Sequence, residues 1–220
     1  MTHSNPTDAQ FEAFRSAYDY FNALLFDGAL RPVFLNFSRA ANTLGFFAPL
    51  RWEREGVTTH EISLNPAYLK QREPRAVVST LVHEMAHCWQ AELGKPGRGG
   101  YHNQEWADKM ESLGLMPSTT AAPGGKRTGD RVSHYIVEGG PFARAFESMP
   151  REYLLPWVCG EASGKAGTKK PRTPSKVKFT CTGCGANAWG RPALSLLCGE
   201  CNVAMQPGAA TDGDQERCAA

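Results

Sequence analysis

The segment His-Glu-Met-Ala-His at residues 83–87 constrains the fold of this chain more than any other stretch. Positions i and i+4 of an α-helix lie on one face, one turn apart, so His83 and His87 can direct both imidazoles at one metal ion. Apolar residues surround the motif on more than one side, which is typical of a buried helix. Pro74 suits the first turn of that helix, because its missing N–H would be unpaired there. The sequence therefore predicts a central helix from Pro74 to about Leu93.

Two histidines at this spacing are typical zinc ligands, with bonds of about 2.0–2.1 Å. Glu84 follows the first histidine directly, so it leans over the metal without entering its coordination shell. A carboxylate there can take a proton from a zinc-bound water and pass it to the leaving amine of a cleaved peptide. A chance match in a core helix is the competing interpretation, and the helical context favours the catalytic one. We expect His83 and His87 to bind zinc and Glu84 to be the catalytic base.

The third zinc ligand is less directly indicated. A catalytic zinc usually takes three protein ligands and leaves one position for water. His102 is the main candidate, because it begins a predicted helix, residues 102–113, whose apolar stripe should face the core. The glycine-rich loop 95–100 lets the chain double back before it. Glu105 and His134 are the alternatives, and His102 could also be an ordinary residue at a helix N-terminus.

The other regular elements follow from hydrophobic spacing. Apolar residues three and four apart predict a helix over 9–26. Short apolar or alternating runs predict strands over 33–37, 45–50 and 58–64, and residues 119–131 are predicted to be a loop. An edge strand can pair with an extended peptide, and strand 58–64 is a candidate for that role, although an ordinary core strand is the stronger interpretation.

The chain has seven cysteines, and four of them form two C-x-x-C pairs separated by 13 residues. The four are Cys181, Cys184, Cys198 and Cys201. Each pair presents two thiolates from a tight turn, and two such turns can close a tetrahedron around a structural zinc. About 30 residues cannot build a stable core alone, so the metal must supply folding energy. A redox-active pair is the alternative.

Cys88 points about 100° away from His87 around the helix, which favours a small core residue over a ligand.

Charge along the chain is uneven, although the net charge is only +2. Between residues 163 and 178 there are six basic residues and no acidic residue. They are Lys165, Lys169, Lys170, Arg172, Lys176 and Lys178. Phe179 and Trp189 are available to stack on bases, so we expect this region to contact DNA. A solvated, flexible linker is the competing interpretation. The polar N-terminus and the lack of about 20 consecutive apolar residues predict neither a signal peptide nor a membrane span.

Taken together, these features resemble the SprT-like family of zinc metalloproteases, which includes the DNA-dependent proteases of the Spartan type. The resemblance rests on the His83–His87 helix, the 14 residues between His87 and His102, the region from Phe21 to Leu30, and the four-cysteine ribbon, and covers residues 10–205. It implies an α+β fold, a zincin-like domain of the gluzincin type followed by a small zinc ribbon. It also implies His83, His87 and His102 as ligands of a catalytic zinc and Glu84 as the base. The family often has Gly-His-Gly around the third ligand, whereas this chain has Tyr101-His102-Asn103.

The expected organisation has five parts. Residues 8–120 form the metalloprotease core, 121–162 an extension that packs on or near it, 163–176 a basic flexible linker, 177–206 the zinc ribbon, and 207–220 a disordered tail.

The expected function is a DNA-associated endopeptidase with two zinc ions, one catalytic and one structural. Its expected substrates are proteins bound or crosslinked to DNA, including single-stranded DNA, which implies a role in DNA repair in the cytoplasm near the nucleoid. One alternative is a nucleic-acid-binding or transcription-related protein that uses the zincin domain as a scaffold, and another is a general peptidase. The intact Glu84 argues against a scaffold. Tyr101, His134 and Tyr135 are candidates for the group that stabilises the oxyanion.

Overall fold

The computed structural model describes residues 5–159 and 176–208 of the chain. The chain divides into two units, Met1–Glu161 and Ala162–Ala220. The predicted basic linker lies outside the described residues except for Lys176, and the predicted tail does so from residue 209 onward. No helix in the described part of the chain is long and apolar enough to cross a membrane.

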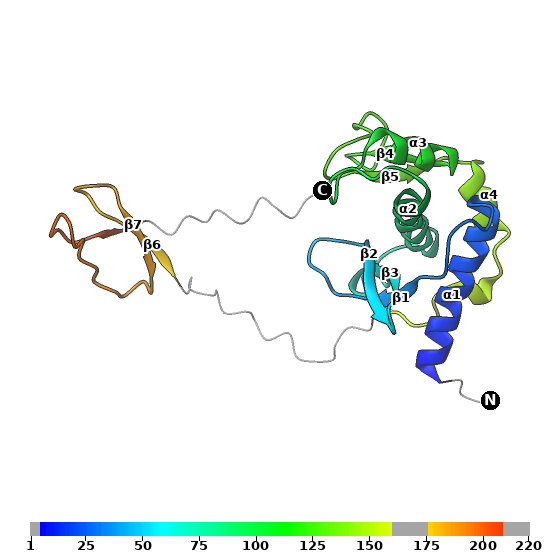
Figure 1. Ribbon diagram of the computed structural model, residues 1–220, viewed down its shortest axis with the longest axis horizontal. Helices are drawn as coiled ribbons and strands as arrows, with labels where there is room; N and C mark the ends of the chain where they lie inside the picture. Colours follow the sequence, from blue (N-terminus) through cyan, green and yellow to red (C-terminus); the bar gives the residue numbers. More distant parts are fainter. Residues whose placement is uncertain (1–4, 160–175, 209–220) are drawn as a thin grey trace. The chain divides into compact units, whose positions relative to one another are not determined.

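The first unit is built around one buried helix. Its elements are α1 (Pro6–Leu25), β1 (Phe34–Phe37), β2 (Gly45–Arg54), β3 (Val57–Leu64), η1 (Pro66–Tyr68), α2 (Pro74–Leu93), α3 (Gln104–Ser112), β4 (Leu115–Ser118), β5 (Ser133–Ile136), α4 (Pro141–Glu147) and η2 (Arg151–Tyr153). Figure 1 shows α2 in the middle, with the β1–β3–β2 sheet on one side and α3, β4 and β5 on the other. The predicted helix from Pro74 to Leu93 is confirmed.

Helix α2 is apolar around most of its circumference, which explains its central position. Leu81, Val82 and Met85 are almost fully buried, and they share one core with Ile62 of β3 and with residues of α1. Burying side chains of this size stabilises the fold by roughly 1.5–3 kcal/mol each. Cys88 is fully buried in the same core, so the prediction that it is a small core residue is confirmed.

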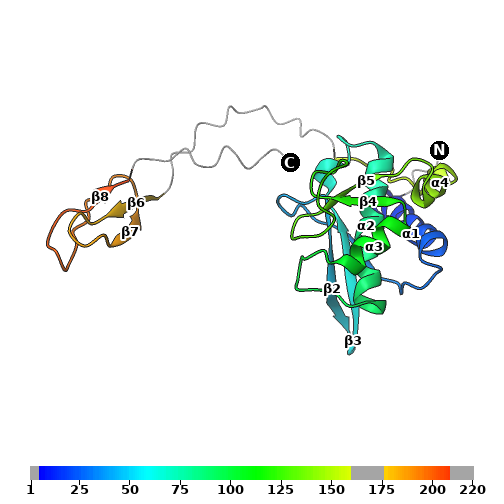
Figure 2. The ribbon, with the colours of Figure 1, turned by 90° about the horizontal axis from the view of Figure 1, so that it is seen from above.

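The sheet has the order β1–β3–β2, with β1 parallel and β2 antiparallel to the central strand β3. Residues 58–64 therefore lie in the central strand, so the stronger interpretation, an ordinary core strand, is confirmed, and the two edges of the sheet are β1 and β2. Strand β2 is also longer than predicted, because it continues past a register shift between Ala48 and Trp52. Glu55 and Gly56 both have positive φ angles and turn the chain back into β3. Figure 2 shows the two strands as a long hairpin beside α2.

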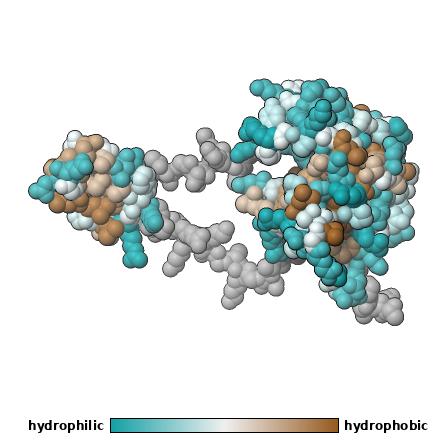
Figure 3. Space-filling model, in the orientation of Figure 1, coloured by the Kyte–Doolittle hydropathy of each residue, from teal (hydrophilic) through white to brown (hydrophobic). Residues whose placement is uncertain are grey.

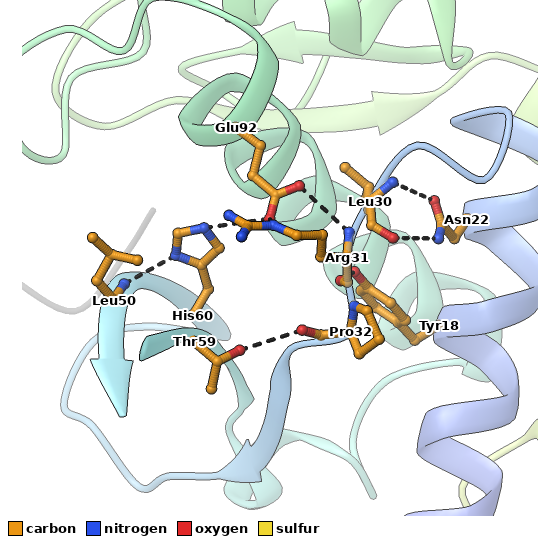
Figure 4. A network of polar contacts seen from close by, with 9 residues as sticks. All are labelled: Tyr18, Asn22, Leu30, Arg31, Pro32, Leu50, Thr59, His60 and Glu92. Atoms are coloured by element: carbon orange, nitrogen blue, oxygen red, sulfur yellow. Dashed lines mark hydrogen bonds and ion pairs between the residues drawn. The ribbon is translucent and has the colours of Figure 1, made fainter. Parts of the chain in front are cut away.

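A polar network ties this hairpin to the end of α2 (Figure 4). The Glu92 carboxylate accepts a hydrogen bond of 3.0 Å from Nε of Arg31, and Nε2 of His60 lies 3.5 Å from the same oxygen. The backbone N–H of Leu50 on β2 donates to Nδ1 of His60 on β3. Because Glu92 is almost fully buried, this network orients the hairpin relative to α2.

Strands β4 and β5 were not predicted, because each has only four residues and their pairing is not visible in local spacing. They form an antiparallel hairpin in which Pro117 lies opposite His134. This pairing carries His134 back toward α2. The following helix α4 packs on α1, with the rings of Phe142 and Phe21 stacked 5.6 Å apart.

The second unit contains a small sheet of order β7–β6–β8, made of β6 (Val177–Thr180), β7 (Asn187–Gly190) and β8 (Gln206–Pro207). Its buried apolar side chains in the described residues are Phe179, Cys181 and Cys198. So small a core gives little hydrophobic stabilisation.

Candidate metal centres

Three histidines meet beside α2. Ligand nitrogens of His83, His87 and His102 lie within 4.8 Å of one another, and Nε2 of His87 is 3.2 Å from Nε2 of His102. A tetrahedral zinc with bonds of about 2.0–2.1 Å would hold its nitrogens about 3.3 Å apart. Helix α2 places His83 and His87 one turn apart, as the spacing predicted. The arrangement therefore fits a zinc ion with three histidine ligands.

His102 reaches this cluster from a bridge in front of α3, and not from the helix itself. Helix α3 begins at Gln104, because the side chain of Asn103 caps it by accepting from the N–H of Trp106. His102 exchanges two backbone hydrogen bonds with Gly129, of 2.9 and 3.0 Å. Its Nδ1 lies 3.1 Å from the same carbonyl oxygen. The bond to Gly129 leaves Nε2 of His102 free to face the other two histidines.

The two alternative ligands lie outside this cluster. Glu105 accepts hydrogen bonds from the N–H of Lys95 and from the side chain of Gln90, which hold its carboxylate at the loop after α2. His134 contacts His83 with Nδ1 and Ser79 with Nε2. Neither residue belongs to the group of nitrogens that could hold one ion.

An indole forms one wall of the cluster. The ring of Trp106, which is fully buried, lies 4.9, 5.0 and 4.3 Å from the rings of His83, His87 and His102. This packing restricts the three rings to few orientations. Burial lowers the pKa of His87 to about 3 and that of His134 to about 4, and it holds the pKa of His83 well below its usual value. Neutral imidazoles carry the lone pair that a metal requires.

Glu84 is buried next to the histidine cluster without belonging to it. Burial raises the pKa of its carboxyl to about 8, although the backbone N–H of Phe47 on β2 donates to it and opposes the rise. A carboxyl group with a raised pKa binds a proton more tightly than a free glutamate does, which suits a group that accepts a proton during a reaction. This interaction places Phe47 of β2 next to Glu84.

The candidate oxyanion groups occupy different places. Tyr101 precedes His102, and the guanidinium of Arg98 lies 5.0 Å from its ring centre. Tyr135 lies on β5, opposite Met116 of β4. His134 is engaged with His83 and Ser79, so it is the one candidate of the three that touches the histidine cluster.

The four cysteines of the second unit also come together. Their sulfurs lie within 4.8 Å of one another, and Sγ of Cys184 is 3.7 Å from Sγ of Cys198. A tetrahedral zinc with Zn–S bonds of about 2.3 Å has sulfurs about 3.8 Å apart. A Cβ at Gly183 would meet Sγ of Cys201 at 3.0 Å, and Gly185 has a φ of +75°. Both glycines are therefore required by the turn, and the sulfur set fits a structural zinc.

The ribbon surface corrects one expectation about nucleic acid. Phe179 is 1% exposed and cannot stack on a base, whereas Trp189 is 64% exposed. Trp189 lies opposite Lys178 in the β6–β7 pair. Apolar residues show on the ribbon in Figure 3, and the exposed ones include Leu194 and Leu197. Lys165, Lys169, Lys170 and Arg172 lie outside the described residues.

Comparison with known proteins gives one match. The model of the SprT-like family matches residues 14–124, which extend from α1 past β4 and include Glu84 and the three clustered histidines. No curated protein and no solved structure matches the chain.

Proposed function

This chain belongs to the SprT-like family, and from that premise we propose that it is a zinc-dependent endopeptidase with a zincin-like, gluzincin-type active site. The observation that carries the proposal is the position of Glu84. It is buried beside three clustered histidines and bonded to the backbone of an edge strand. His83, His87 and His102 would hold the zinc.

The zinc would lower the pKa of a bound water and polarise the peptide carbonyl. The Glu84 carboxylate would accept a proton from such a water and return it to the leaving amine. Burial of a carboxyl group costs free energy, so a purely structural role would not favour Glu84 at this position. This cost argues against the alternative of a non-proteolytic scaffold.

The edge strand β2 supports an extended substrate. The backbone N–H of Phe47 interacts with Glu84, and β2 is an edge strand of its sheet, so an edge strand borders the proposed base. A peptide that adds to this edge would satisfy the strand's unpaired backbone groups and pass beside the histidines. We therefore propose that strand β2, Gly45–Arg54, and not residues 58–64, pairs with the extended peptide substrate.

We further propose that the substrates are proteins bound or crosslinked to DNA, including single-stranded DNA. The exposed Trp189 can stack on a base, and its neighbour Lys178 can contact a phosphate. The basic residues from Lys165 to Lys176 extend this charge along the chain. Binding the DNA that carries the target raises the effective concentration of substrate near the zinc. Such a protease would act at the nucleoid.

The peptidase proposal is tested with Glu84→Gln in the full chain. We expect this variant to keep both zinc ions and to cleave a DNA-binding protein at least roughly 100-fold more slowly, because the amide cannot accept the proton. Unchanged cleavage by the variant would remove Glu84 from the mechanism. A zinc-loaded wild-type protein that binds DNA and cleaves nothing would favour the scaffold.

The DNA proposal needs a separate measurement. One protein is offered free and crosslinked to single-stranded DNA, and Trp189→Ala is compared with Leu197→Ala, which is equally exposed but cannot stack as an aromatic ring. We expect Trp189→Ala to slow cleavage of the crosslinked form selectively, and Leu197→Ala to leave it unchanged. Equal cleavage of the free and crosslinked forms by the wild type would favour a general peptidase.

A further inference from the structure

His83 has a partner from a distant part of the chain. Its Nδ1 lies 3.1 Å from Nδ1 of His134, which stands on β5. The two ring centres are 5.3 Å apart and the rings are tilted by 38°, so they meet through their nitrogens and not as a face-to-face stack. The other nitrogen of His134, Nε2, lies 2.9 Å from the hydroxyl oxygen of Ser79, one turn before His83 on α2.

The Ser79 hydroxyl on α2 determines which atoms donate and which accept in these hydrogen bonds. The hydroxyl of Ser79 lies 3.0 Å from the carbonyl oxygen of Ala76 and donates to it. Its oxygen then accepts from Nε2–H of His134. A neutral imidazole that carries its hydrogen on Nε2 has a lone pair on Nδ1. His134 therefore accepts a hydrogen bond from Nδ1–H of His83.

The same direction follows from the metal side. A neutral histidine that binds a metal through Nε2 must carry its hydrogen on Nδ1, and that hydrogen needs an acceptor when it is buried. His102 satisfies this requirement with the carbonyl oxygen of Gly129. For His83 the corresponding acceptor is a side chain, Nδ1 of His134.

We propose that His134 is a positioning residue that holds His83 in the Nδ1–H tautomer, so that the lone pair of Nε2 faces the metal before the metal binds. Ser79 acts one step further out, by fixing the tautomer of His134. The inference rests on the proposed zinc site, and it adds a residue that lies beyond the matched family range, which ends at residue 124.

The test compares two substitutions of His134 in the full chain. His134→Phe fills the space but has no acceptor, whereas the Oδ1 of His134→Asn can still accept from Nδ1–H of His83. Zinc affinity of the histidine site is measured against a competing chelator, with the ribbon zinc as internal reference. We expect His134→Phe to bind zinc roughly 10–100-fold more weakly and His134→Asn to stay within roughly threefold of the wild type.

A second readout reports the tautomer directly. In the zinc-free protein, imidazole ¹⁵N shifts should show the Nδ1–H form of His83 in the wild type and in His134→Asn, and its loss in His134→Phe. Equal zinc affinity and an unchanged tautomer in His134→Phe would overturn the proposal. Zinc binding by His134→Asn as weak as that of His134→Phe would also overturn it, because packing would then be the cause.

These readouts are independent of peptide cleavage. If the wild type binds zinc at the histidines but cleaves no substrate, the proposed function fails while the affinity and tautomer data still decide the role of His134. If the single substitution Ser79→Ala weakens zinc binding, but adding it to His134→Phe weakens binding no further, then Ser79 acts on the zinc site through His134, as proposed. Additive effects would contradict that order.

Discussion

At the scale of single residues, His102 and Glu105 illustrate how three positions separate a candidate ligand from a structural group. His102 lies in an extended bridge, where the carbonyl of Gly129 orients its ring toward α2. Glu105 lies in the first turn of α3 and holds the loop after α2 through Lys95 and Gln90. The cap at Asn103 separates the two roles, because it ends the extended segment and starts the helix.

His102→Ala should therefore remove the histidine-site zinc, with an affinity loss beyond the roughly 10–100-fold typical of an outer-shell change. Glu105→Ala should keep that zinc and reduce the free energy of unfolding by about 1–3 kcal/mol, because two donors lose a charged acceptor. Zinc content and chemical denaturation of both variants check this prediction. If His102→Ala retained two zinc ions, the third ligand would have to be one of the alternatives, Glu105 or His134.

At the scale of elements, the distance between β2 and α2 decides whether the edge strand can serve the site. Gly45, the first residue of β2, lies close to β3 and to α2. A Cβ there would stand 2.8 Å from the carbonyl oxygen of Ser63 and 3.2 Å from Cγ2 of Thr80. Two residues further along, Phe47 donates its N–H to Glu84. The missing side chain at Gly45 thus lets the strand lie close enough to α2 for this bond.

Gly45→Ala should lower the free energy of unfolding by roughly 1–3 kcal/mol, because backbone atoms must move to admit the methyl group. Cleavage should fall as well, since the shift carries Phe47 away from Glu84. Gly99→Ala is the matched control, because nothing lies within 4 Å of the added Cβ, and its effect should stay within about 0.5 kcal/mol. Equal stability of the two variants would show that β2 adapts freely.

At the scale of the whole molecule, the two candidate zinc sites belong to separate units, and the folds of these units should depend on their metal to different extents. The first unit has a large apolar core, and that core is built from residues other than the three clustered histidines. The ribbon has few buried apolar side chains in the part that the structure describes. Its fold should therefore depend on its metal much more strongly than the fold of the first unit does.

We accordingly predict two zinc ions per chain that can be lost independently. Cys198→Ser should remove one zinc and unfold the ribbon, while the thermal transition of the first unit stays within a few degrees. His87→Ala should remove the other zinc and leave the ribbon folded. Cys159→Ser, which changes a thiol outside both clusters, should retain two. A single zinc in the fully loaded wild-type protein would contradict the prediction.

The sequence by itself determined the features whose physics is local. The i, i+4 spacing of His83 and His87 specifies one helix face, and each C-x-x-C pair specifies one turn, so α2 and the grouping of the cysteines could be predicted without tertiary contacts. The family followed from the same motifs.

Only the tertiary structure decided which parts distant in sequence meet. It placed residues 58–64 at the centre of the sheet and β2 at one of its edges, buried Phe179 inside the ribbon, and brought His134 to His83 across 51 residues. Strand pairing and burial depend on contacts between segments whose local patterns look alike, so neighbouring residues carry little information about them.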